Sequence, residues 1–318
     1  MNSHSKRGFI YLTLTIMLFS TYEVVSRTLV GKIDPAQVNF IRFLFGGIIL
    51  SPLALLEIKK SQTKLTGKDL VQMALLGFLL VGISMNLLQY GINETQANIS
   101  AAIFSFNPIF VALVAAILLR EPLGLKKILG LCVGFAGVAI IFFSYDNGGQ
   151  LYLHGLIYLV LAALAFGIYT VLGKKFTLKF GSITMNAVTF LFGSLLFIPF
   201  LLWRGIPLFS ISLDIIPQIA YLSVFVTGLA YYSYFKGLGL TDTSLGSMVF
   251  FVKPPLACLL AALTLGEQLT WGFALGTLII LTSIYALQEK PKKATSPRYL
   301  TKEKTQPKGK HEACREVI

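Results

Sequence analysis

The chain has 318 residues, of which 55% are hydrophobic and 13% charged, and its mean hydropathy is +0.74. A soluble domain has about 25% charged residues, so this composition excludes a soluble globular protein as well as a disordered or disulfide-rich secreted chain. The net charge of +13 would indicate nucleic-acid binding only in a soluble protein, and the sequence instead predicts an all-α polytopic membrane protein.

Ten stretches are apolar and long enough to cross a bilayer as helices, which need about 20 residues. In chain order they cover residues 8–30, 36–56, 70–91, 97–119, 123–144, 151–172, 185–203, 215–235, 243–265 and 269–287. Their connections are short, so we expect one helical bundle. Residues 1–7 are predicted to be a cytoplasmic N-terminus, and the Lys- and Pro-rich residues 289–318 a basic, disordered cytoplasmic tail.

Basic residues predict the orientation of the spans, because Lys and Arg accumulate on the cytoplasmic side. With the N-terminus inside, thirteen Lys and Arg residues fall in inner connections, and only Lys32 and Arg204 fall in outer ones. Both termini are therefore expected in the cytoplasm, where the basic face contacts anionic lipid.

The sequence contains an internal duplication. Residues 8–53 align with 155–200 at an offset of 147, and residues 91–139 align with 237–285 at an offset of 146. We therefore expect a first five-helix repeat over 8–144 and a second over 151–288. Because five is odd, the two repeats enter the membrane from opposite sides. Inverted repeats of this kind are typical of secondary transporters, whose sites lie near the midplane between the repeats.

The sequence also resembles a known family. The five-plus-five arrangement, Arg42-Phe43 in span 2, and the paired elements that contain Asn107-Pro108 and Lys253-Pro254 are similar to the drug/metabolite transporter superfamily, EamA type. The resemblance covers about residues 8–288. It implies a ten-helix carrier of amino acids or other small metabolites.

Four ionisable residues lie inside the predicted spans, where a charge costs about 2.5–3.5 kcal/mol. Glu23 and Arg42 are predicted at one depth on neighbouring spans, so we expect them to pair. Arg27 lies one turn after Glu23 on the same helix face. Two interpretations remain open: a structural ion pair between spans 1 and 2, or a gate that responds to protons or to the solute.

Lys253 is predicted at the centre of span 9, with no acidic residue expected at its depth. Pro254 and Pro255 follow it, and its counterpart in the first repeat is Asn107, followed by Pro108. Proline interrupts a helix and frees carbonyls that can coordinate a ligand. A fixed cation at such a break indicates a solute with an anionic group. The alternative is a lysine that is deprotonated in an apolar pocket or bonded to carbonyls.

Further polar residues are candidates for the same cavity: Asn86, Gln89 and Tyr90 on span 3, Tyr169 on span 6 and Tyr231 on span 8. The alternatives are asparagines that bridge helices and tyrosines that lie at the membrane interface. Glu121 and Glu267 end equivalent spans, where we expect them to cap helices.

The sequence thus predicts a secondary transporter of the cell membrane that moves a small organic metabolite, an amino acid or a related solute with an anionic group, by alternating access. The alternative is an intramembrane enzyme acting on a lipid-linked substrate, although no group of residues for acid/base or nucleophilic catalysis is evident. We expect no catalytic residues, no metal, no cofactor and no nucleic acid, and a monomer or homodimer in the lipid bilayer.

Overall fold

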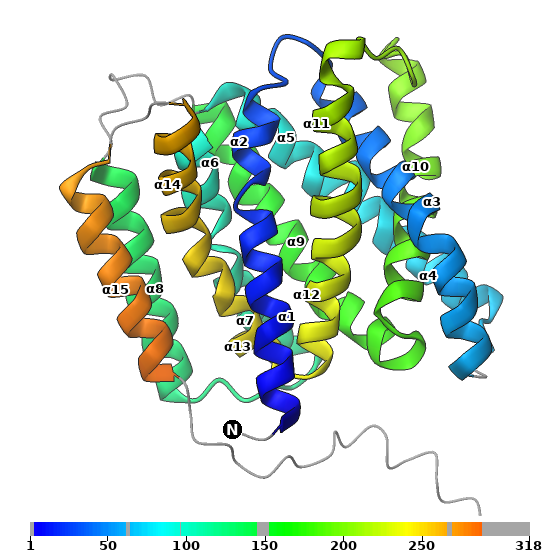
Figure 1. Ribbon diagram of the computed structural model, residues 1–318. Coiled ribbons are helices and arrows are strands. Elements are labelled where there is room, and N and C mark those ends of the chain that lie inside the picture. Colours follow the sequence, from blue (N-terminus) through cyan, green and yellow to red (C-terminus); the bar gives the residue numbers. More distant parts are fainter. Residues whose placement is uncertain (1–2, 62–63, 96, 145–152, 266–268, 288–318) are drawn as a thin grey trace, which may run out of the picture.

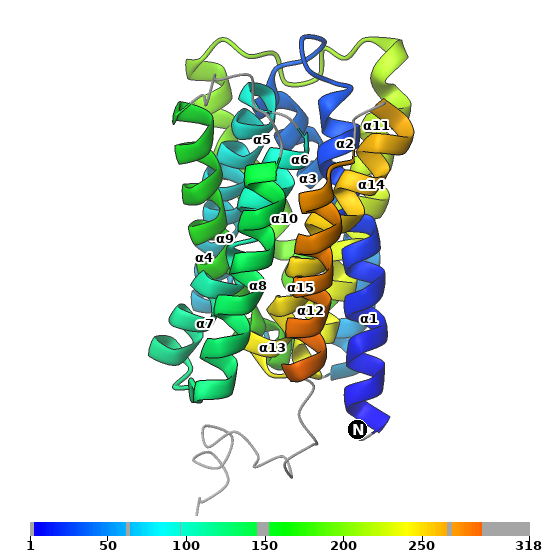
Figure 2. The same cartoon turned by 90° about the vertical axis from the view of Figure 1, so that its left-hand side faces the viewer.

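Figure 1 shows a computed structural model of the chain, which describes residues 3–61, 64–95, 97–144, 153–265 and 269–287. Within these ranges the chain is helical and contains no strand. The helices run side by side along one direction, as Figures 1 and 2 both show. The predicted tail over 289–318 lies outside the described residues.

The helices divide between the two halves of the chain. The first half forms α1 (Ser3–Phe19), α2 (Tyr22–Arg27), α3 (Pro35–Ser61), α4 (Gly67–Phe78), η1 (Leu79–Ser84), α5 (Met85–Glu94), α6 (Ala97–Phe104), α7 (Asn107–Leu118) and α8 (Leu125–Ser144). The second half forms α9 (Leu153–Phe180), α10 (Ser182–Trp203), η2 (Leu213–Ile215), α11 (Ile216–Tyr221), η3 (Leu222–Leu229), α12 (Ala230–Gly239), α13 (Thr243–Ser247), η4 (Met248–Val252), α14 (Lys253–Leu265) and α15 (Trp271–Leu287).

Among the residues that the structure describes, seven helical stretches are long and apolar enough to cross a membrane. They cover Arg7–Arg27, Pro35–Lys60, Gly67–Glu94, Ile99–Leu118, Leu153–Phe180, Ser182–Trp203 and Leu213–Gly239, and two shorter apolar helices cover Met248–Thr264 and Trp271–Ser283. The predicted class, an all-helical polytopic membrane protein, is therefore confirmed, whereas the count of ten spans and the cytoplasmic termini stay predictions.

The distribution of side chains is that of a protein in lipid. Large apolar side chains such as Ile117 and Leu263 lie on the outside, about three-quarters exposed. Polar side chains lie inside: Arg42 and Asn186 are at most 1% exposed. Exposing a polar or charged group to hydrocarbon costs free energy, so these groups lie within the bundle rather than on its lipid-facing surface.

Two predicted spans are not continuous α-helices, which the sequence did not indicate. η1 and η3 are π-helices at equivalent places in the two halves. A π-segment misaligns the backbone hydrogen bonds and is frequent at functional sites. Asn39 of α3 donates its amide N–H to the carbonyl oxygen of Val81 in η1 over 2.5 Å, so a buried side chain stabilises this segment.

Glycines allow two helices to cross at backbone contact. A Cβ atom on Gly77 of α4 would lie 2.0 Å from the carbonyl oxygen of Thr189 on α10, and a Cβ on Gly193 would lie 2.4 Å from the Gly77 oxygen. The two helices therefore pack this closely because Gly77 and Gly193 carry no side chain at the crossing point.

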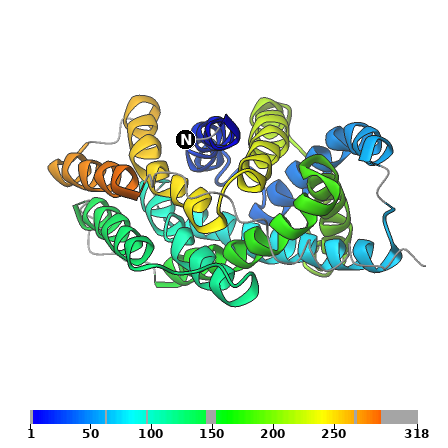
Figure 3. The same cartoon turned by 90° about the horizontal axis from the view of Figure 1, so that it is seen from below.

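Small residues of α8 and α15 pack against each other within the chain. α8 and α15 lie together at one end of the elongated bundle, seen from below in Figure 3. Ser283 donates to the carbonyl oxygen of Gly130 over 2.8 Å, and a Cβ on Gly137 would lie 2.8 Å from the oxygen of Gly276.

Candidate functional site

A small buried cavity lies between the two halves of the chain, and its lining side chains leave a free volume of about 20 Å³. Every residue that lines it is at most 5% exposed. The lining residues are mostly aromatic or aliphatic and include two cations: Phe19, Tyr22, Arg42, Met85, Leu88, Phe104, Phe166, Val226, Tyr231, Phe250 and Lys253. Both halves therefore build one compartment that is apolar in most of its wall and cationic at two points.

Much of the wall consists of residues that are counterparts in the two repeats. Three pairs of lining residues are separated by the offsets of 147 or 146 seen in the sequence: Phe19 and Phe166, Phe104 and Phe250, and Met85 and Tyr231. The rings of Phe104 and Phe166 lie 5.4 Å apart, and those of Phe166 and Phe250 5.7 Å apart. Sequence reasoning missed these phenylalanines, although their recurrence at the repeat offset was a usable signal.

Lys253, the first residue of α14, forms an ion pair with Glu23 of α2. Both side chains are at most 2% exposed. No acidic residue was expected at the depth of Lys253, and the contact with Glu23 corrects this expectation. The long, flexible lysine stem allows a partner that depth along the helix did not indicate. The Lys253 ammonium also lies 4.8 Å from the centre of the Phe104 ring.

Arg42, in α3, was expected to pair with Glu23, which instead contacts Lys253. The Arg42 guanidinium lies 4.6 Å from the ring centre of Tyr22 and 4.3 Å from that of Phe43. Its Nη1 donates to the hydroxyl of Thr227 over 3.2 Å. Its Nε and Nη2 have no hydrogen-bond partner within the part of the chain that the structure describes. Arg42 is thus a buried cation at the cavity whose hydrogen-bond and ring contacts are with neutral side chains.

The other residues predicted on spans 1 and 3 lie around the cavity without lining it. Arg27 donates to the backbone oxygens of Ile92 and Asn93, over 3.0 and 3.2 Å. Gln89 accepts a hydrogen bond from the hydroxyl of Tyr22, a lining residue. Arg27 therefore fastens α2 to α5, and Gln89 orients a residue of the cavity wall.

Asn86 and Tyr90 are the remaining candidates on α5. Asn86 is 7% exposed. The ring centres of Tyr90 and Tyr158 of α9 lie 6.3 Å apart. Neither lines the cavity. Of the two predicted tyrosines on later spans, Tyr231 lines the cavity, and Tyr169 packs behind it with 6.4 Å between ring centres.

The predicted helix breaks lie where one helical segment ends and the next begins. α6 ends at Phe104 and α7 begins at Asn107, with Pro108 in its first turn. In the second half, the 3-10 helix η4 gives way to α14 at Lys253, followed by Pro254 and Pro255. Asn107 does not line the cavity: its amide donates to the backbone oxygen of Ala163 over 3.1 Å.

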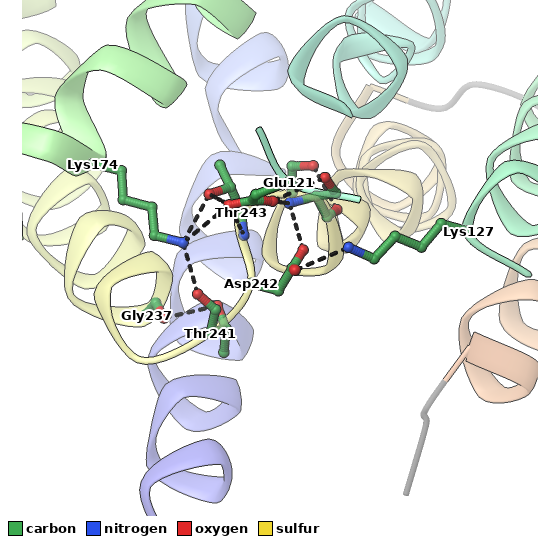
Figure 4. Close-up of polar contacts among 9 residues, drawn as sticks. Glu121, Lys127, Lys174, Gly237, Thr241, Asp242 and Thr243 are labelled. Atoms are coloured by element: carbon green, nitrogen blue, oxygen red, sulfur yellow. Dashed lines mark hydrogen bonds and ion pairs between the residues drawn. The ribbon is translucent and has the colours of Figure 1, made fainter. Parts of the chain in front are cut away.

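A second polar cluster lies at the end of the bundle where α1 begins, shown in Figure 4. Lys174 of α9 lies 3.6 Å from a carboxylate oxygen of Glu121 and donates to the hydroxyl of Thr243 over 2.7 Å. Lys127 of α8 forms an ion pair with Asp242 at 2.9 Å. Glu121 and Lys127 belong to the first half and their partners to the second, so the cluster joins the two halves.

Glu121 caps a helix, but not the following one as a local interpretation would suggest. Its carboxylate accepts from the hydroxyl and backbone N–H of Thr243 and from Ser244, at the start of α13 in the other half. The equivalent Glu267 lies outside the described residues. Cross-half capping has no signal in the local sequence, because the partners are more than a hundred residues apart.

The two halves of the chain match one family model. The model of the EamA-like transporter family matches residues 6–143 and again residues 153–287. The chain belongs to the EamA-like transporter family. The resemblance seen in the sequence is thereby confirmed, and the protein is an integral multi-pass membrane protein of the cell membrane.

Relatives of this EamA-family protein are transporters by name. An "uncharacterized transporter" of Clostridium kluyveri is 36% identical over 283 residues, which cover 87% of this chain and 91% of the relative. The transporter YvbV of Bacillus subtilis, likewise described as uncharacterized, is 28% identical and covers 90% of this chain and 93% of its own. These names indicate a membrane transporter rather than an enzyme.

One solved structure, described as the crystal structure of a protein, aligns with a TM-score of 0.70. The alignment covers 90% of this chain and 96% of that chain at 18% identity. At this identity the likeness shows the shared fold alone.

Proposed function

We propose that this membrane transporter is a secondary carrier of a small organic metabolite, an amino acid or a related solute with a carboxylate group. The carrier works by alternating access around the central cavity. The observation that carries the proposal is Arg42: a 1% exposed guanidinium that lines the cavity and has two nitrogen atoms without partners among the described residues.

The chemistry of the guanidinium supports a carboxylate as the recognised group. Its planar fork of N–H donors matches the two oxygens of a carboxylate, and buried donors without partners cost about 1–3 kcal/mol each. The rings of Tyr22 and Phe43 contact the cation, but an aromatic ring cannot satisfy the N–H groups in the plane of the fork. A bound carboxylate would remove this cost, so Arg42 favours solutes that carry one.

The size of the cavity favours a small solute. The lining side chains leave a free volume of only about 20 Å³, room for about one water molecule, so a solute must displace these side chains to enter and a compact solute requires the smallest displacement. The aromatic wall offers contact surface for an apolar part of the solute beside the two cations. The combination fits a compact amphipathic metabolite better than a lipid-linked substrate.

The contacts between the halves support alternating access. The cluster of Glu121, Lys174 and Thr243 joins the halves at the end where α1 begins, which the predicted topology assigns to the cytoplasm. The ion pair of Glu23 and Lys253 joins them beside the cavity. Because ion pairs between packed bodies have discrete made and broken states, such contacts suit a carrier that switches between two conformations.

The proposal is tested first by ligand binding. Purified protein is screened by thermal denaturation against amino acids, organic acids, amines and nucleobases, because a bound ligand raises stability by about 2.7 kcal/mol at a concentration of 100 times Kd. We expect stabilisation only by compounds that carry a carboxylate. Arg42→Gln should abolish that stabilisation, whereas Arg204→Gln, an exposed arginine outside the cavity, should leave it unchanged.

A stabilising carboxylate is then used in radiolabelled form for counterflow in proteoliposomes. We expect labelled solute to accumulate in vesicles preloaded with the unlabelled compound, and not with Arg42→Gln. Stabilisation by amines or nucleobases alone would contradict the proposal, and so would conversion of the compound to a product without its transport.

A further inference from the structure

The side chains at the cavity carry three charges that can be added up. Arg42 and Lys253 line the cavity, and Glu23 contacts Lys253 from α2. All three are at most 2% exposed. Because all three are buried, their charges act on the cavity with little screening.

Two of these charges cancel. The ammonium of Lys253 and the carboxylate of Glu23 are in contact as an ion pair. Breaking a buried pair by removal of one partner is strongly unfavourable, because it leaves an uncompensated charge. The pair therefore contributes no net charge while it is intact, even though Lys253 is itself a lining residue.

Arg42 is the charge that remains. Its hydrogen-bond partner, Thr227, is neutral, and its ring contacts with Tyr22 and Phe43 are neutral as well. The sum over Glu23, Arg42 and Lys253 is therefore one positive charge. A solute with one negative charge makes the filled cavity neutral, whereas a neutral solute leaves a buried cation and a dianion leaves a buried anion.

We infer that the Glu23–Lys253 pair limits the solute to one net negative charge, with Glu23 as a residue that determines specificity. This inference rests on the proposed function, because it assumes that the solute occupies the cavity beside Arg42. Among carboxylates of one shape, the carrier accepts the monoanion and rejects the neutral and the dianionic forms. Among amino acids and related solutes, this selects those with one excess negative charge, such as simple hydroxy acids or acidic amino acids.

The charge of the cavity can be changed one unit at a time. Glu23→Gln leaves Arg42 and Lys253 and raises the sum to two positive charges. Lys253→Gln leaves Glu23 and Arg42 and lowers the sum to zero. The double variant Glu23→Gln/Lys253→Gln restores one positive charge and is the matched control, because it carries both substitutions without a change in net charge.

The probes are sets of three compounds that share one shape: the diamide, the monoamide-monoacid and the diacid of one skeleton. The sets are succinamide, succinamate and succinate, together with the corresponding malonic, glutaric, adipic and phthalic compounds. At pH 7.5 the members of each set carry zero, one and two negative charges. Dissociation constants are measured by thermal stabilisation of the purified full-length chain.

For one or more sets, we expect the wild-type protein to bind the monoacid at least about tenfold more tightly than the diamide and the diacid. Tenfold is a lower bound, because a buried unpaired charge is costly. Glu23→Gln should shift this preference to the diacid, and Lys253→Gln to the diamide. The double variant should retain the wild-type preference. Should one single variant fail to fold, the other single variant and the double variant still decide the question.

The outcomes separate this inference from the proposed function. If the wild-type protein binds a monoacid but the single variants keep the same preference, the charge inference is wrong and the proposed function stands. If the wild-type protein binds all three members of a set equally, the charge inference is likewise wrong and the proposed function stands. If the wild-type protein binds a diacid but no monoacid, the charge inference is wrong and the proposed function stands. If it binds neither a monoacid nor a diacid of any set, both are overturned.

Discussion

Glu121 allows a direct test of whether its polar cluster holds the two halves together at the end of the bundle where α1 begins. Its carboxylate accepts hydrogen bonds from Thr243 on one oxygen and from Ser244 on the other, and it lies 3.6 Å from the ammonium of Lys174. The change Glu121→Gln removes the charge and turns one acceptor into a donor. Glu121 and Lys174 are only 16% and 10% exposed in their side chains, so solvent compensates for little of the loss.

The magnitude follows from these contacts. A hydrogen bond to a charged group contributes about 1.5–3 kcal/mol, and Lys174 keeps its bonds to Thr241 and Thr243, so we take about 2 kcal/mol for the loss. This corresponds to about a 30-fold shift toward the conformation that is open at this end, at about 1.4 kcal/mol per tenfold change.

The assay uses Ser247→Cys in a background in which the native cysteines are replaced by serine. Ser247 is fully buried in α13, between the Glu121 cluster and the cavity side chain of Phe250. Labelling by a water-soluble maleimide then reports opening, and Glu121→Gln should raise the labelling rate by about 30-fold when the end opens and closes faster than the reagent reacts.

The control is Asp214→Asn, which removes the acidic partner of an exposed ion pair with Lys32. It should leave the labelling rate unchanged. The reasoning is refuted if Glu121→Gln labels no faster than the background, or if Asp214→Asn labels equally fast.

Two further predictions concern stability. Gly77→Ala should lower the free energy of unfolding by about 3 kcal/mol, because its Cβ would lie 2.0 Å from the backbone oxygen of Thr189; Gly67→Ala, on the same helix with open space around it, is the control and should be neutral in a detergent melting curve. Asn39→Leu should cost about 1–3 kcal/mol in the same measurement, because the Val81 carbonyl in η1 loses its side-chain donor. A wild-type melting temperature for either Gly77→Ala or Asn39→Leu would contradict these helix contacts.

The membrane class could be predicted from sequence because hydropathy is a local property of about 20 residues. The breaks before Asn107 and Lys253 could be located for a similar reason, since proline restricts the backbone of its own segment. The π-helices had no comparable signal: Leu79–Ser84 contains no proline, and a single glycine such as Gly82 is tolerated within an α-helix.

The pairing of charges was the part that sequence could not supply. Glu23 was assigned to Arg42 because the two are close in depth and lie on adjacent spans. The structure joins Glu23 to Lys253 instead, 230 residues away. Depth along the membrane normal is readable from sequence, but the lateral order of the helices is not, and a flexible lysine widens the set of partners that depth alone allows.

The repeat counterparts of the two cavity cations are neutral: Thr189 corresponds to Arg42, and Asn107 corresponds to Lys253. The aromatic wall is thus nearly symmetric between the halves, whereas the charges are not. In a carrier whose halves exchange conformations, a symmetric molecule would have inward-open and outward-open states of equal energy. Under the proposed alternating access, the unequal charges remove that equivalence, and we expect the empty carrier to have a preferred resting side.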